Sequence, residues 1–199
     1  MIQFLAEKTA RYLAKDCKGA DVEVLTYGYY LFYQEWLIIA AALLAAVPFG
    51  LFFHVLTSFI AFNLIRRRAM GAHAKYPIVC RIISYTIWFS PAILAVIFSF
   101  RLTPLVSAGL YIFGVVSLLI YAPSETDVVK VRCPQKRKRF KLEAIAWLSA
   151  LFLSAILAQG LFPDISFVIV VTVTLTCCMV HPWMYWINGF DPVTKEVRG

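Results

Sequence analysis

Long apolar runs separated by short polar segments extend over most of this chain. The first run, residues 29–65, contains only four strongly polar side chains, namely Gln34, Glu35, His54 and Asn63. It is too long for one membrane span, because roughly 20 helical residues cross the hydrocarbon core. Pro48 and Gly50 predict a tight turn that divides the run into two spans, the second of which ends at three consecutive arginines, Arg66 to Arg68.

Four further apolar runs follow, at residues 77–100, 102–121, 144–161 and 165–187. Only Arg101 and Thr103-Pro104 separate the first two, and Phe162-Pro163-Asp164 separates the last two. Between the two pairs lies a segment that we interpret as a basic loop, residues 130–141. The pattern predicts an all-α, polytopic membrane protein in which residues 29–187 form a bundle of six transmembrane helices.

The amino-terminal segment, residues 2–18, has helical periodicity. One side is mainly apolar (Ile2, Leu5, Ala6, Leu13 and Cys17), and the opposite side is basic (Lys8, Arg11, Lys15 and Lys18). This is typical of an amphipathic interfacial helix lying in an anionic membrane surface. A helix that packs its apolar side on the rest of the protein fits the pattern equally well.

Composition supports a membrane protein with a single domain spanning residues 1–199. Apolar residues make up 61% of the chain and charged residues 15%, and the mean hydropathy is +0.77. A soluble domain carries about 25% charged residues. The start of the chain lacks the features of a cleavable signal peptide. None of the five cysteines has the spacing of a zinc site or a disulfide framework, so we expect no metal and no cofactor.

The distribution of basic residues predicts the orientation in the membrane. Six spans place eighteen of the nineteen Lys and Arg residues on one side and only Arg101 on the other. By the positive-inside rule, that side is cytoplasmic and holds both termini. The net charge of +8 therefore reflects membrane topology, and we expect no nucleic-acid partner.

The candidate catalytic residues lie between the second predicted span and the start of the third. Pro77 is well placed to start the third helix, which puts Cys80 in its first turn. There the helix dipole favours a thiolate. Gly71 would allow a sharp turn, through positive φ if needed, that brings His73 back toward Cys80. A histidine and a cysteine so placed could form a base and a nucleophile. A small apolar cysteine and an interfacial histidine remain the alternative.

Two motifs resemble the accessory gene regulator B (AgrB) family of membrane peptidases. The first is Arg66-Arg67-x-x-x-Gly71-x-His73-Ala74 followed by Cys80. The second is Tyr121-Ala122-Pro123-Ser124-Glu125-Thr126, similar to the family's Tyr-Ala-Pro-x-x-Thr. Length, six-span layout and basic segments are similar too, so the resemblance covers essentially the whole chain.

The resemblance implies a cysteine endopeptidase of a bacterial cytoplasmic membrane. Such an enzyme cleaves a short amphipathic, AgrD-like precursor peptide and helps to cyclise it to a thiolactone or lactone quorum-sensing signal. Cys80 would be the nucleophile and His73 its base, on the cytoplasmic side, with Arg66 and Gly71 at supporting or substrate-binding positions. The implied partners are this peptide and the lipid bilayer, and a homodimer is left open.

The chain departs from the family pattern in two places. Pro77 stands where other members carry a hydroxyl residue, and Asp127-Val128-Val129 replaces a Lys-Lys-Pro run. A third catalytic member that orients His73 is also undecided. Either the site is a plain dyad, or the third member is one of Gln34, Glu35, Glu125 and Asp127.

A non-enzymatic exporter or channel for a small peptide is the rival interpretation. It predicts that Cys80 is dispensable and that the polar intramembrane residues His54 and Asn63 matter more.

The predicted topology can be tested with reporter fusions. A reporter fused after Gly199 should be cytoplasmic, because eighteen basic residues lie on that side. Reporters near Arg101 or Asp164 should respond as external. An external carboxyl terminus would contradict both the six-span arrangement and the cytoplasmic site.

Overall fold

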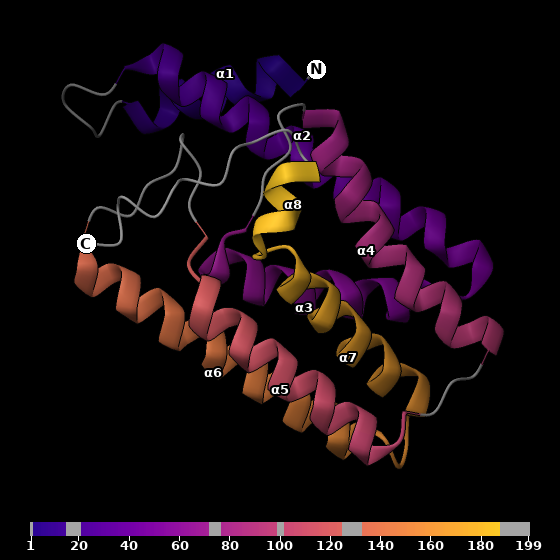
Figure 1. Ribbon diagram of the computed structural model, residues 1–199. Helices are drawn as coiled ribbons and strands as arrows, with labels where there is room; N and C mark the ends of the chain where they lie inside the picture. The colour runs from indigo at the N-terminus through magenta and orange to yellow at the C-terminus, as the bar shows by residue number, and fades with distance from the viewer. Residues whose placement is uncertain (1, 15–20, 72–76, 99–101, 125–132, 188–199) are drawn as a thin grey trace. The chain divides into compact units, whose positions relative to one another are not determined.

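The computed structural model describes residues 2–14, 21–71, 77–98, 102–124 and 133–187 (Figure 1). Within these ranges the regular structure is helical, apart from one isolated bridge between Met70 and Ser124. The chain divides into two compact units, Met1–Phe52 and Phe53–Gly199.

The first unit contains α1 (Ile2–Ala14), α2 (Val22–Ala46) and the short 3-10 helix η1 (Val47–Phe49). The Asp21 carboxylate accepts a hydrogen bond from the Glu23 backbone N–H and caps α2. The helix therefore begins at Val22, before the predicted start of the first span at Tyr29. Gly50, with φ +68°, ends η1 in the left-handed region, which confirms the predicted turn.

Helix α1 packs on α2 through its smallest residues. Ala6 and Ala10 are fully buried, and the Thr9 and Tyr33 hydroxyls form a hydrogen bond of 2.9 Å. Leu5 and Leu13, which belong to the predicted apolar side, remain exposed. Residues 15–18 of the predicted amphipathic helix lie outside the described residues, and its place at a membrane surface stays a prediction.

The second unit contains most of α3 (Phe52–Ala69), together with α4 (Pro77–Phe98), α5 (Pro104–Tyr121), α6 (Pro134–Ala158), α7 (Pro163–Cys178) and the short α8 (Pro182–Ile187). Each helix from α4 to α8 starts at a proline. Proline suits the first helical position because its fixed φ is already helical and that position needs no N–H donor.

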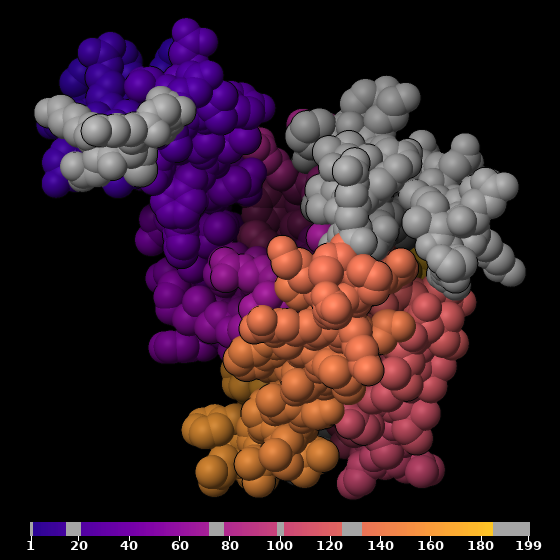
Figure 2. All heavy atoms as spheres, turned by 90° about the vertical axis from the view of Figure 1, so that its left-hand side faces the viewer, coloured from indigo at the N-terminus to yellow at the C-terminus, as the bar shows by residue number. Residues whose placement is uncertain are grey.

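Helix α7 forms the core of this unit, with α4, α5 and α6 packed around it. Val168, Val173 and Cys177 on α7 are completely buried. The Thr172 hydroxyl donates to Ser58 on α3 over 3.1 Å, which links α3 to α7 as well. On one face of the unit, α6 and α5 lie side by side (Figure 2).

Helices lie near all six predicted spans, and within the described ranges four are long and apolar enough to cross a membrane: residues 22–49, 78–98, 104–121 and 134–158. The other two are α3, with three arginines in its last turn, and the 16-residue α7. The helical, membrane-like character is therefore confirmed, while six spans with both termini cytoplasmic remains a prediction.

Two further boundaries differ from the prediction. The segment interpreted as a basic loop is helical from Pro134 onward, so Lys136 to Lys141 form the first turns of α6. Lysine and arginine are good helix formers, and Pro134 favours a helix start. The sixth predicted span does not run unbroken to Ile187: α7 ends at Cys178, and a turn leads to Pro182 and α8. Proline cannot continue a helix from the preceding turn without losing a hydrogen bond.

Close packing around α7 depends on Gly114 of α5. A Cβ atom at this position would lie 3.2 Å from a Leu148 methyl carbon of α6 and 3.5 Å from the Cys177 sulfur of α7. At Gly109, also on α5, no described atom outside the helix's own backbone lies within 4 Å of the equivalent point. A side chain would therefore crowd its neighbours at Gly114 and meet open space at Gly109.

Replacing Gly114 with leucine should destabilise the protein by roughly 1–3 kcal/mol, because the extra atoms overpack the core. The midpoint of thermal unfolding in detergent, followed through labelling of buried Cys177 by a thiol-reactive dye, measures this. Gly109→Leu is the matched control and should unfold close to the parent protein. Equal destabilisation by both substitutions would contradict the packing described.

Candidate functional site

The exit from α3 is fixed by two residues with positive φ. Met70 has φ +61° and Gly71 has φ +106°. Gly71 is buried, and a Cβ atom there would lie 3.2 Å from the Met179 carbonyl oxygen. Only glycine combines this conformation with this close approach. The predicted sharp turn before His73 is thus confirmed at Gly71.

Ser124 joins this exit to the ends of two other helices. Its N–H donates to Ala69 O over 3.0 Å, and its carbonyl accepts from Gly71 N over 3.3 Å. Its hydroxyl lies 2.8 Å from Val180 O and 3.0 Å from Tyr121 O. One serine therefore connects the carboxyl ends of α3, α5 and α7.

Cys80 lies in the first turn of α4, which begins at Pro77 as predicted. It is half-buried, and its carbonyl oxygen accepts a hydrogen bond of 3.0 Å from the Ser84 hydroxyl. The amino end of α4 carries partial positive charge, which favours negative charge on a nearby sulfur.

Arg66, in the last turn of α3, contacts Cys80. Its Nη2 lies 4.0 Å from Cys80 Sγ, and its Nη1 lies 3.2 Å from the Met179 thioether sulfur. The guanidinium also lies over the Phe62 ring, 5.3 Å from the centroid. The structure thus brings together Arg66, Gly71 and Cys80, three of the four predicted site residues.

The neighbouring arginines are placed differently. Arg67 is exposed. Arg68 forms an ion pair of 2.9 Å with Glu143 of α6 and lies over the Phe140 ring. Three consecutive basic residues therefore have three different surroundings.

His73, the predicted base, lies outside the described residues, so its pairing with Cys80 stays a prediction. Among the candidates for a third member, Glu125 and Asp127 also lie outside them, while Gln34 and Glu35 lie on α2 in the first unit. The third member therefore remains open.

The intramembrane polar residues of the rival interpretation both lie on α3. Asn63 Nδ2 donates to Phe59 O over 2.8 Å within the helix. His54 is half-buried, and its Nδ1 has no hydrogen-bond partner among the described residues. The amide group of Asn63 is therefore paired within its own helix.

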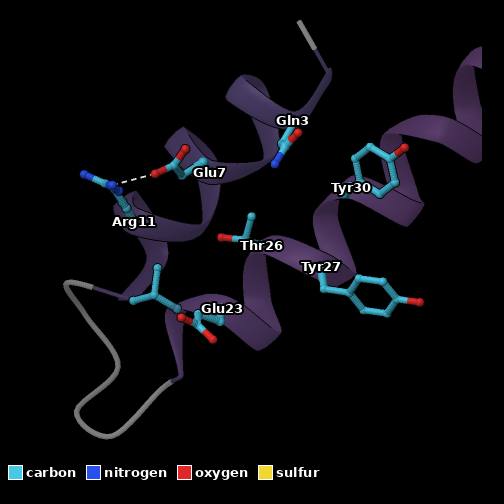
Figure 3. Close-up of a pocket in the computed structure, with 8 residues that line it drawn as sticks. Gln3, Glu7, Arg11, Glu23, Thr26, Tyr27 and Tyr30 are labelled. Atoms are coloured by element: carbon cyan, nitrogen blue, oxygen red, sulfur yellow. Dashed lines mark hydrogen bonds and ion pairs between the residues drawn. The ribbon is translucent and has the colours of Figure 1, made fainter.

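A pocket of about 620 Å³ opens between α1 and α2 within the first unit (Figure 3). Glu7 and Arg11 form an ion pair on its α1 side. Its lining is polar and aromatic: Gln3, Glu7, Arg11, Val22, Glu23, Thr26, Tyr27 and Tyr30. In the described part of the chain, no cluster of His, Cys, Asp or Glu could hold a metal ion.

Met179 and Ser124 are the site contacts that the sequence did not reveal. Ser124 lies within the Tyr-Ala-Pro motif, which hinted at its neighbourhood but not at its partners. Met179 belongs to no motif, and it contacts Arg66 from 113 positions away in the chain.

Comparisons with known proteins show which family the sequence resembles. The family model described as Accessory gene regulator B matches residues 6–180. An accessory gene regulator protein B of Staphylococcus aureus strain JH9 is 35% identical over 109 residues, and that of strain bovine RF122 is 30% identical over 108 residues. Each alignment covers 54% of this chain and 57% of the relative, so the chain matches little more than half the length of these proteins.

A longer alignment joins the chain to an AgrB-like protein of Clostridium perfringens strain SM101. The two are 20% identical over 186 residues, covering 91% of this chain and 86% of the relative. No solved structure matches the chain. Since the family model extends over most of the sequence, the chain belongs to the Accessory gene regulator B family.

Proposed function

We propose that this protein is a membrane-embedded cysteine endopeptidase that processes a quorum-sensing precursor peptide. It cleaves the peptide through a Cys80 acyl-enzyme and promotes cyclisation of the product to a thiolactone or lactone signal. Membership of the AgrB family supports the quorum-sensing role. The observation that carries the proposal is the Arg66 guanidinium at 4.0 Å from a half-buried cysteine at a helix amino terminus.

In the first step, His73 accepts the proton of the Cys80 thiol, and the sulfur attacks a carbonyl carbon of the precursor. The peptide C–N bond then breaks, and the leaving amine takes the proton from the imidazolium of His73. The carboxyl-terminal fragment departs. The remaining peptide is joined to Cys80 as a thioester.

In the second step, an internal thiol or hydroxyl of the bound peptide attacks this thioester. The C–S bond to Cys80 breaks, the ring is released, and the proton returns to the cysteine by way of His73. Exchange between two thioesters is nearly isoenergetic, so the acyl group stays activated. Forming a thioester from an amide is uphill, and loss of the cleaved fragment must therefore draw the reaction forward.

Arg66 supplies fixed positive charge where negative charge develops. The sulfur is negative before attack and again when the ring leaves. A cation in a partly buried place interacts more strongly with it than a cation in bulk water would. The supporting role of Gly71 is to let the chain leave α3 in the direction that the turn requires.

The apolar helices support a location in a membrane. In our proposal residues 1–199 form one peptidase domain with six spans in the cytoplasmic membrane, and the site opens on the cytoplasmic side. The precursor, an amphipathic AgrD-like peptide, would lie on the inner leaflet at the depth of Cys80. An amino-terminal helix at the interface suits such a substrate.

Replacing Cys80 with alanine should abolish cleavage while leaving the protein in the membrane, because a methyl group cannot form an acyl-enzyme. The assay is co-expression with a candidate amphipathic precursor peptide, sought among small reading frames near this gene, with mass spectrometry of the products. Cys133→Ala, Cys177→Ala and Cys178→Ala are matched controls that should cleave nearly normally. Undiminished processing by Cys80→Ala would favour the exporter interpretation.

The role of His73 is tested in the same assay. His73→Ala should lose cleavage and should slow the reaction of Cys80 with iodoacetamide near neutral pH, because the thiol loses its base. Alkylation that keeps its rate and pH dependence would show that His73 does not activate Cys80.

Arg66→Gln should slow alkylation of Cys80 roughly three- to tenfold, because the sulfur loses a positive charge that lies 4.0 Å away. Arg67→Gln removes the same charge from the next, exposed position and should change the rate little. Peptide mapping must separate the sites of labelling. The backbone N–H groups of Lys136 and Gln135 lower the pKa of Cys133, which will react as well. Equal slowing by both substitutions would point to general surface charge.

A further inference from the structure

The three residues that follow α7 each contact a different part of the site. Met179 meets Arg66 and Gly71, the carbonyl of Val180 accepts from Ser124, and His181 meets α5. Met179 and Val180 are buried, with exposed fractions of 3% and 2%. A short turn outside both family motifs thus contacts the Arg66–Gly71 exit.

His181 anchors this turn on α5. Its Nε2 lies 2.9 Å from the Ser117 hydroxyl oxygen, and that hydroxyl donates its only proton to Phe113 O over 2.7 Å. Nε2 must therefore be the donor to Ser117. The ring is stacked on Phe113 and tilted against Tyr121, with centroid distances of 5.7 Å and 4.6 Å. These contacts hold the turn in place.

With the turn held, Met179 fixes the orientation of the Arg66 guanidinium. The two terminal nitrogens of a guanidinium lie in one plane at a fixed angle. Nη1 is directed to the Met179 sulfur at 3.2 Å while Nη2 reaches Cys80 at 4.0 Å. The Phe62 ring lies below the same group. Movement of Nη1 away from the thioether would turn Nη2 away from the nucleophile.

We infer that Met179 is a positioning residue of the active site, which holds the Arg66 guanidinium against the Cys80 sulfur. The inference rests on the proposed function for its catalytic meaning. The coupling of Met179 to Cys80 through Arg66 is a property of the geometry and can be measured without any substrate.

The experiment is a double-mutant cycle on the full-length protein in detergent, read by iodoacetamide alkylation of Cys80. Met179→Leu keeps the volume and removes the sulfur acceptor, and it should slow alkylation roughly three- to tenfold. In an Arg66→Gln background the same substitution should have no further effect, because the group that Met179 orients is already absent. The inference would be wrong if the double variant were slowed by the product of the two factors measured for the single variants.

Two further variants separate positioning from general loss of structure. Met179→Gln restores an acceptor on a chain of similar length, and it should recover alkylation when Met179→Leu does not. Val173→Ala, at a fully buried position on α7, is the control for core disruption, and its effect should be independent of Arg66. Met179 would only support the fold if two results came together. Met179→Gln would alkylate as slowly as Met179→Leu, and the effect of Val173→Ala would depend on whether Arg66 is present.

Cleavage of the candidate precursor peptide from the co-expression assay gives a second readout. Met179→Leu should lower kcat with little change in KM, because Arg66 acts on the sulfur and not on substrate binding. If Cys80→Ala still cleaves, the proposed function fails whatever the alkylation cycle shows. If Cys80 is essential but the free-energy effects of Met179→Leu and Arg66→Gln on alkylation simply add, only the positioning role of Met179 fails.

Discussion

Helix ends leave carbonyl groups that need hydrogen-bond donors, and this need organises the candidate site. The last carbonyls of a helix have no partner within it, and a buried carbonyl without a donor costs free energy. Here the Ser124 N–H donates to the carbonyl of Ala69, the last residue of α3, and the Ser124 hydroxyl donates to Val180 O, just beyond the end of α7. The same serine accepts from Gly71. Satisfying the backbone therefore gathers three segments, and the functional side chains follow from where those segments meet.

Local steric rules account for what the sequence predicted correctly. Gly50 and Gly71 have positive φ, and Pro77 starts α4. Each outcome depends on a single residue and its immediate neighbours, which is why it can be foreseen. The positions of six apolar helices were also visible, because hydrophobic runs of that length have few other structures available.

Contacts between distant residues could not be foreseen in the same way. Met179 reaches Arg66 across 113 positions, and Ser124 reaches Val180 across 56. The periodicity of apolar residues along the sequence does not indicate which distant residues form such pairs. The triple arginine shows the limit clearly: membrane topology explains all three charges alike, yet only Arg66 contacts Cys80, and Arg68 serves as a tie to Glu143. The start of α6 differs from the predicted loop because lysine and arginine, although charged, are good helix formers.

The order of the two helices gives the site an electrical polarity. Arg66 belongs to the last turn of α3, where the backbone carbonyls point out of the helix end and make it negative, and Cys80 belongs to the first turn of α4, where the N–H groups make it positive. In the proposed reaction, a cation and a developing anion therefore each lie at a helix end of opposite sign. Exchanging the two residues would keep both side chains but set each against a like charge. The proposed chemistry is thus tied to the order and direction of the two helices along the chain.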